Sequence, residues 1–268
     1  MIRDITIGQY YPAESVIHRL DPRVKLVGTL TFIISLFLHR SFLMYLVAAV
    51  FLTIVIKASK VPFRFMIKGL KAIMVLLLIT VVFNMFLTPG TPFIRIWKLT
   101  LTVEGVKQAA FMAIRLAFLI VGSSVMTLTT TPNHLTDGME KGLAPLNKLH
   151  VPVHEVSMIM SIALRFIPIL LEETDKIMKA QEARGADFDS GNLIQKAKSL
   201  VPLLVPLFIS AFRRANDLAM AMEARGYRGG EGRTKMKPLI YQKRDRMAYG
   251  VLLGYLAVMI LVGQFAPF

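Results

Sequence analysis

The chain contains no cysteine among its 268 residues. Disulfide bonds, iron–sulfur clusters and thiolate zinc sites are therefore excluded, because each of them requires cysteine sulfur. Acidic residues are also scarce: 17 aspartates and glutamates stand against 32 lysines and arginines, which gives a formal net charge of +15. The phosphate-cradling pattern Gly-x-x-x-x-Gly-Lys-Ser/Thr is missing, as are His-Glu-x-x-His and Gly-x-Ser-x-Gly. These absences argue against an enzyme that carries out its own nucleotide, zinc or serine chemistry.

What the chain has in abundance is apolar sequence. Hydrophobic residues make up 54% of it, and the mean hydropathy is +0.56. They gather in uncharged runs long enough to cross hydrocarbon, so we predict an all-α polytopic membrane protein with about five transmembrane helices plus long amphipathic cytoplasmic helices. In this class basic residues mark the cytoplasmic side, so the positive charge predicts contact with membrane lipid and no nucleic-acid partner. The five predicted spans cover residues 24–38, 42–56, 72–87, 109–129 and 247–265.

The basic residues between the spans predict the orientation. The loop expected at 57–71 carries five of them and no acid, which places it in the cytoplasm. The N-terminus is then cytoplasmic, the C-terminus lies outside, and no cleaved signal peptide is expected. The predicted parts are an N-terminal tail with four transmembrane helices (1–130), a cytoplasmic region (131–246) and a C-terminal transmembrane helix (247–268). The five basic residues are Lys57, Lys60, Arg64, Lys68 and Lys71.

Shorter patterns give local predictions. Asp21 followed by Pro22 is a helix-start signal. Alternating residues after Pro92 predict a short β-hairpin or extended segment outside the membrane, with Trp97 as an interfacial anchor. Arg115 is the one charge well inside a clean span, where snorkelling, pairing within the bundle or contact with substrate are all open. His150 and His154 have Pro152 between them and no obvious third ligand, so no metal site is expected.

The 131–246 region contains two amphipathic segments of roughly thirty residues, at 153–184 and 193–225, and a shorter one near 135–149. Each long segment would extend about 45 Å as a helix. Pro168, Pro202 and Pro206 are expected to bend or break these helices. Two readings are open: helices lying at the inner membrane face, or further spans at 156–171 and 200–212. We favour the first, because 200–212 is short for a span and contains two prolines.

Each long segment ends in the same tetrapeptide, Glu-Ala-Arg-Gly, at 182–185 and again at 223–226. Arginine in a last turn favours the negative end of the helix dipole, and the following glycine can adopt the left-handed cap conformation. Two copies predict two rods, each with a guanidinium at its tip, that engage two similar acidic sockets. Glu182 and Glu223 are interpreted as solvated charges. The predicted partner-binding residues are Ala183, Arg184, Gly185, Ala224, Arg225 and Gly226.

The stretch Ser15-Val16-Ile17-His18-Arg19-Leu20-Asp21-Pro22-Arg23-Val24-Lys25, the order of spans and both Ala-Arg-Gly motifs together resemble the transmembrane (T) component of energy-coupling factor transporters, a branch of the ABC systems. The resemblance covers essentially the whole chain. It implies that two cytoplasmic ABC-type ATPase subunits bind the helix tips, with Arg184 and Arg225 docking in one ATPase each. It also implies a small membrane-embedded substrate-binding S component on the apolar helix faces.

By this resemblance the complex takes up vitamins or other micronutrients across a bacterial cell membrane. The chain itself binds no cofactor, since ATP and Mg are bound by the partner ATPases, and the S component selects the substrate. A secondary transporter is disfavoured, because broken spans with polar residues near the midplane and inverted repeats are not evident. A membrane scaffold or assembly factor that does not transport would use the same arginine-tipped helices, and this alternative stays open.

Overall fold

The protein is described by a computed structural model at residues 10–38, 41–96, 99–186, 188, 192–229, 236 and 238–265. These described residues form two compact units, one made of those within 8–138 and 239–268 and the other of those within 139–238. The predicted division at 130 and 246 concerns sides of the membrane and stays a prediction.

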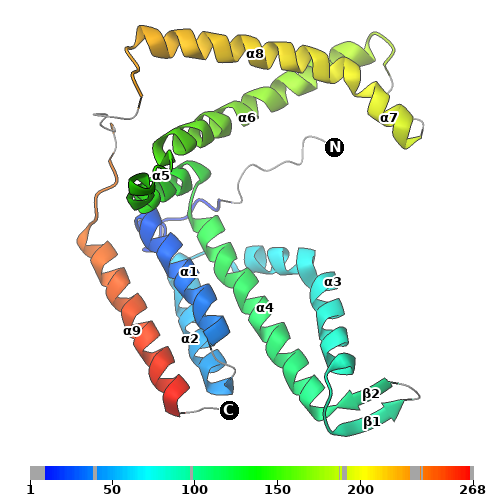
Figure 1. Ribbon diagram of the computed structural model, residues 1–268, viewed down its shortest axis with the longest axis vertical. Coiled ribbons are helices and arrows are strands. Elements are labelled where there is room, and N and C mark those ends of the chain that lie inside the picture. Colours follow the sequence, from blue (N-terminus) through cyan, green and yellow to red (C-terminus); the bar gives the residue numbers. More distant parts are fainter. Residues whose placement is uncertain are drawn as a thin grey trace. The chain divides into compact units, whose positions relative to one another are not determined.

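The elements, shown in Figure 1, are α1 (Pro22–Leu38), α2 (Phe42–Ser59), α3 (Phe63–Leu87), β1 (Pro92–Ile96), β2 (Leu99–Thr102), α4 (Val103–Thr129), α5 (Pro132–Leu143), the 3₁₀ helix η2 (Ala144–Leu149), α6 (Val153–Glu182), α7 (Leu193–Ser199), α8 (Val201–Ala224) and α9 (Lys243–Phe265).

In the first unit, α1, α2, α4 and α9 pack alongside one another, and α3 packs on α4 (Figure 1). Their shared core includes Phe32, Leu36, Ala48 and Tyr255, all buried. The outward faces stay apolar: Val75, for example, is exposed on α3. An apolar surface around an apolar core is what hydrocarbon solvent requires of a helical bundle. The predicted all-α membrane class is confirmed.

Four of the described helices are long and apolar enough to cross a membrane: α2, α4, α6 and α9. The apolar part of α3, Ile73–Leu87, is a shorter candidate, and α1 has 17 residues. Three of the five predicted spans, those in α2, α4 and α9, are therefore long and apolar enough to cross a membrane. The length and composition of α6 suit a span as well as a helix at the membrane face, and its placement at the membrane face stays a prediction.

The prediction of a basic loop at 57–71 is wrong. Lys57 lies in the last turn of α2 and Lys60 adopts the left-handed cap conformation, but α3 begins at Phe63 and already contains Arg64, Lys68 and Lys71. Lysine and arginine are good helix formers, so an interruption of hydropathy need not interrupt the helix. In Figure 1 the first part of α3 and its remainder run in different directions.

The predicted hairpin is confirmed. β1 and β2 pair antiparallel, with Ile94 opposite Leu101 and Ile96 opposite Leu99. The side chain of Glu104 at the start of α4 holds the approach to the hairpin, because it accepts hydrogen bonds from the Thr91 backbone N–H at 2.8 Å and from the Thr91 hydroxyl. The predicted anchor Trp97 lies outside the described residues.

The second unit contains the two long amphipathic segments, and it has a break beside Pro202 but none at Pro168 or Pro206. Pro168 lies inside the uninterrupted helix α6, and Pro206 lies inside the uninterrupted helix α8. The one break in the 193–225 segment falls at Leu200, between α7 and α8, two residues before Pro202. Pro202 then lies in the first turn of α8, where a missing N–H costs no helical hydrogen bond.

Candidate functional site

The first predicted tip closes α6 in a defined turn. Gly185 has φ +87°, in the left-handed region. Its N–H donates to the Glu182 carbonyl at 2.9 Å, and the Ala186 N–H donates to the Gln181 carbonyl at 3.0 Å. This pair of bonds is the Schellman arrangement, in which glycine allows the chain to reverse after the last helical turn. Arg184 therefore stands at a fixed position, immediately before the reversal.

The second tip repeats the same geometry at the end of α8. Gly226 has φ +70°. Its N–H donates to the Glu223 carbonyl at 2.9 Å, and the Tyr227 N–H donates to the Met222 carbonyl at 3.0 Å. Two segments with little other sequence in common thus end in one local structure. The repeated tetrapeptide encodes it, because an arginine followed by glycine is a helix-end signal in both places.

Both tips are presented to the surroundings. Arg184 and Arg225 are exposed, and so are the alanines before them and the glutamates at 182 and 223. Within the described ranges neither arginine forms an ion pair. A guanidinium carries five N–H donors in a planar fork that suits a carboxylate. Each tip is therefore free to bind an acidic group of another molecule.

The need for glycine at these tips is conformational and can be tested. A Cβ at Gly226 would meet no atom within 4 Å, but its φ lies in the left-handed region. Alanine there costs about 1–2 kcal/mol. We expect Gly226→Ala to speed hydrogen exchange of the Tyr227 amide by about five- to thirtyfold, measured by mass spectrometry.

The matched control is Gly250→Ala in α9. That glycine is also open but has ordinary helical φ, so its substitution should leave exchange at the tip unchanged. Equal exchange of the Tyr227 amide in the wild type and in Gly226→Ala would contradict the requirement for glycine.

The structure does not bring the two tips together. α6 and α8 pack antiparallel, because Glu173 of α6 contacts Ser210 and Arg214 of α8 while Gln181 of α6 contacts Pro202 at the start of α8. Arg184 thus lies within about one helical turn of the start of α8, and Arg225 lies beyond its end. The 24 residues of α8 set the tips about 36 Å apart.

Two polar contacts hold this arrangement, and sequence reasoning missed both. Glu173 accepts a hydrogen bond from the Ser210 hydroxyl at 2.9 Å and forms an ion pair with Arg214. Gln181 donates from Nε2 to the Pro202 carbonyl at 3.3 Å. That carbonyl is the one that residue 206 would normally bond, and Pro206 has no N–H to offer. The side chain next to the first tip therefore satisfies an acceptor that the proline of the other helix leaves free.

The apolar residues of this helix pair are also exposed. On α8, Val201, Val205, Phe208 and Phe212 recur at helical spacing and are exposed, and α6 exposes Val156, Ile159 and Met160. Such a stripe is buried by a neighbour or by lipid in the working protein. This apolar stripe is a second candidate binding surface, in addition to the two cationic tips.

The N-terminal stretch that carried part of the resemblance ties the first unit together. The Asp21 carboxylate pairs with Arg23, with Oδ2 at 2.9 Å from the guanidinium. The Asp21 backbone N–H donates to Oδ1 of Asp245 at 2.9 Å, across 224 residues of sequence. The guanidinium of Arg23 also stacks over the Tyr241 ring, 3.7 Å from its centroid. The starts of α1 and α9 are thereby joined.

The surroundings of Asp21 and His18, which precede the first predicted span, shift the pKa of each side chain. Burial acts to raise the pKa of the Asp21 carboxyl, but the hydrogen bonds from Arg23 outweigh it and hold that pKa below its ordinary value. Burial lowers the pKa of His18, whose ring nitrogens lie 2.7 Å from the Ser15 hydroxyl and 3.0 Å from the Tyr11 carbonyl. Both groups serve the packing of the N-terminal segment.

The remaining candidates resolve as structural. Arg115 donates from Nε to the Tyr45 hydroxyl at 2.9 Å and lies over the Phe37 ring, so it pairs within the bundle. His154 lies 3.0 Å from Glu140. Among the described residues no three histidines, aspartates or glutamates are grouped to hold a metal ion.

Comparison with known proteins identifies the family to which the chain belongs. Residues 13–236 match the CbiQ family, described as cobalt transport protein. Curated relatives that carry the name energy-coupling factor transporter transmembrane protein EcfT include those of Clostridium kluyveri (59% identical over 263 residues, 97% of either chain) and Thermosediminibacter oceani (53% over 264 residues, 98% of this chain and 99% of the relative). The protein of that name from Bacillus subtilis is 48% identical over 246 residues, 91% of this chain and 93% of the relative. The chain therefore belongs to the family of EcfT proteins, the non-catalytic, multi-pass transmembrane components of energy-coupling factor transporters.

Proposed function

We propose that this chain couples two cytoplasmic ABC-type ATPases to a small substrate-binding S component in the membrane. The observation that carries the proposal is the pair of identical arginine tips at opposite ends of one antiparallel helix pair. At a separation of about 36 Å along α8, a single socket could not hold both tips. Two similar sockets on two similar subunits match them.

The chemistry of each tip fits an ATPase groove lined by acidic groups. Arg184 or Arg225 supplies a bidentate fork, and the small side chains of Ala183 and Ala224 let the partner approach the helix end closely. The residue set proposed for docking is the one predicted from the sequence: Ala183, Arg184, Gly185, Ala224, Arg225 and Gly226. ATP and Mg are bound by the ATPases, and this chain needs no cofactor.

Coupling requires that motion at the tips reaches the membrane. When ATP draws the two ATPases together, the tips are drawn with them. The Glu173–Arg214 and Gln181–Pro202 contacts then make α6 and α8 move as one crossed pair. The exposed apolar stripe on this pair, which includes Phe208 and Phe212, contacts the S component and tilts it, so that its bound vitamin or other micronutrient is released inward.

The proposed setting is a bacterial cell membrane with the N-terminus and residues 131–246 in the cytoplasm. The basic residues from Lys57 to Lys71 support this orientation, because they lie at the end of α2 and the start of α3, on one side of the bundle. The tips then lie on the side where ATP is available.

A pull-down tests the proposal. The tagged full-length chain is purified in mild detergent after mixing with membrane and cytosol extract of its host, and its partners are identified by mass spectrometry. We expect two P-loop ATPases and one small, very apolar membrane protein, with the ATPases lost when Arg184 and Arg225 are both alanine. Recovery of unrelated partners that do not depend on these arginines would favour the alternative of a membrane scaffold or assembly factor.

A further inference from the structure

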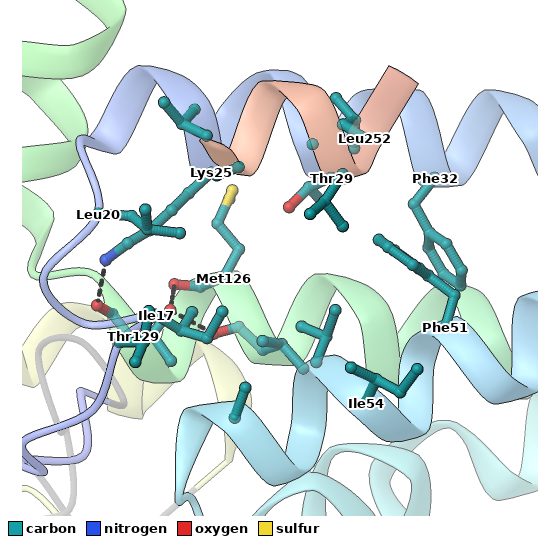
Figure 2. A pocket seen from close by; sticks show the side chains of 18 of the residues that line it. Ile17, Leu20, Lys25, Thr29, Phe32, Phe51, Ile54, Met126, Thr129 and Leu252 are labelled. Carbon is teal, nitrogen blue, oxygen red and sulfur yellow. Dashed lines mark hydrogen bonds between the residues drawn. The ribbon is translucent and has the colours of Figure 1, made fainter. Parts of the chain in front are cut away.

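A pocket with a volume of about 420 Å³ lies between α1, α2, α4 and α9. Figure 2 shows Lys25 at one end of it and the rings of Phe32 and Phe51 at the other, with Thr29 between them. The walls along this length are apolar. Of the described residues that line the pocket, four have polar side chains and none is acidic: Lys25, Thr29, Thr129 and Arg244.

The polar end of the pocket is cationic. Lys25 is buried and donates from Nζ to the carbonyl oxygens of Thr129 at 2.8 Å and of His18 at 3.2 Å. Both acceptors are neutral, so they orient the ammonium without cancelling its charge. The Nε of Arg244 is buried without a hydrogen-bond partner in the described part of the chain. Neither cation forms an ion pair with a described residue.

The two carboxylates of this region are already engaged. Asp21 is bound by Arg23, and Asp245 accepts from the backbone N–H groups of Asp21 and Gln242. Backbone N–H groups leave the charge of Asp245 in place, so Arg23, Lys25 and Arg244 stand as three positive charges against the two carboxylates, and this end of the pocket is net positive. The Asp21–Asp245 contact also brings the starts of α1 and α9 together, which puts both cations at the same end of the bundle.

The dimensions match part of a lipid. Lys25 and Phe32 are seven residues apart on α1, which is about 10 Å along the helix axis. The hydrocarbon of one leaflet is about 15 Å deep, half of the bilayer core. The apolar length of the pocket therefore accommodates the upper portion of one acyl chain that begins at headgroup level. An apolar space of this size left empty would cost stability.

We propose that this pocket binds one acyl chain of an anionic glycerophospholipid, whose phosphate is held by Lys25 and Arg244. The acyl chain lies between α9 and the other three helices and ends against Phe32 and Phe51. The cations select an anionic headgroup, and the aromatic end limits how deeply the chain enters. The lipid chain thus fills the space between α9 and the helices α1, α2 and α4. This assignment is independent of the ATPase docking proposed above.

Bromine-labelled lipids test the assignment, because a brominated acyl chain quenches tryptophan fluorescence on contact. The sole tryptophan is removed as Trp97→Phe, and Phe51→Trp places a reporter at the inner end of the pocket. The full-length chain is put into bilayers that contain small fractions of phosphatidylglycerol or phosphatidylcholine with the same brominated chain. We expect phosphatidylglycerol to quench at a mole fraction lower by about fivefold or more.

Matched variants separate pocket binding from general lipid contact. Val50→Trp reports from the neighbouring residue of α2, which is exposed and does not line the pocket, and should be quenched equally by both lipids. Arg244→Gln and Lys25→Gln should each reduce the preference seen at Phe51→Trp. Thr29→Phe fills the pocket and should protect the reporter from both lipids.

Three results would overturn the proposal. One is equal quenching of Phe51→Trp by the two lipids, and another is the same phosphatidylglycerol preference at Val50→Trp. The third is absence of quenching at Phe51→Trp by either lipid, which would leave the pocket to a side chain of a partner protein.

Discussion

Replacing both Arg184 and Arg225 by alanine is expected to abolish ATP-driven uptake while the chain remains folded and in the membrane. Both side chains are exposed and make no ion pair within the described ranges, so their removal leaves the fold untouched. In the complex each truncation would leave a partner carboxylate desolvated and unpaired. Such a loss costs about 2–5 kcal/mol at each tip, enough to weaken each contact by roughly 30-fold or more.

The measurement is uptake of the substrate into proteoliposomes that contain the whole complex, with ATP hydrolysis recorded alongside. Each single variant should reduce uptake strongly, because motion must be passed through both tips, and Arg→Lys should restore part of it since lysine keeps the charge but lacks the fork. Arg213→Ala is the matched control: it removes an exposed arginine of α8 that is outside the motif. Normal uptake by the double variant would end the coupling proposal.

Removing the Asp245 carboxylate should give the largest loss of stability among the substitutions considered. This side chain is 2% exposed. Oδ1 accepts from the Asp21 N–H at 2.9 Å and Oδ2 accepts from the Gln242 N–H at 2.8 Å. Asp245→Ala leaves the Asp21 N–H buried without an acceptor, at about 1–3 kcal/mol, and removes the acceptor of the more accessible Gln242 N–H. We expect the apparent melting temperature in detergent to fall by about 5 °C or more.

Asp245→Asn refines this test, because one amide oxygen can still accept from one of the two N–H groups. Its melting temperature should lie between those of Asp245→Ala and the wild type. Asp217→Asn on α8 serves as the control, since Asp217 is exposed. A melting temperature of Asp245→Ala equal to that of the control would show that the contact between the starts of α1 and α9 does not stabilise the unit.

Local signals in the sequence predicted local structure well. The glycines at 185 and 226 predicted the two helix ends, because a left-handed cap is a property of a few consecutive residues. The alternation after Pro92 predicted the hairpin for the same reason. The start of α1 at Pro22 followed from its Asp-Pro signal. The site residues themselves were named from such signals, although their role in binding stays a prediction.

The wrong predictions concern the loop expected at 57–71 and the effect expected of Pro206 on α8. The basic residues before the third span were interpreted as a loop, but Arg64, Lys68 and Lys71 suit a helix as well as leucine does. Pro206 was expected to disturb α8, yet the carbonyl it leaves free is bonded by Gln181 from another helix. No pattern in the sequence announces that contact, because it depends on how α6 and α8 cross.

The same limit applied to the antiparallel placement of the tips and to the Asp21–Asp245 contact. Both depend on pairings between residues far apart in the chain, and a single sequence provides no measure of which residues meet. The repeated tetrapeptide predicted two similar tips, but their separation of about 36 Å follows only from the packing of α6 against α8.

The joining of α1 to α9 also sets an order of events during synthesis. The acceptor for the Asp21 N–H is made 224 residues after its donor, which at ribosomal rates of about 5–20 residues per second means a delay of roughly 10 to 45 s. Throughout that interval the first helices are in place while the last is still unmade. The earliest part of the chain to leave the ribosome is therefore among the last to reach its final packing, and its assembly waits for the whole helix pair that carries the tips.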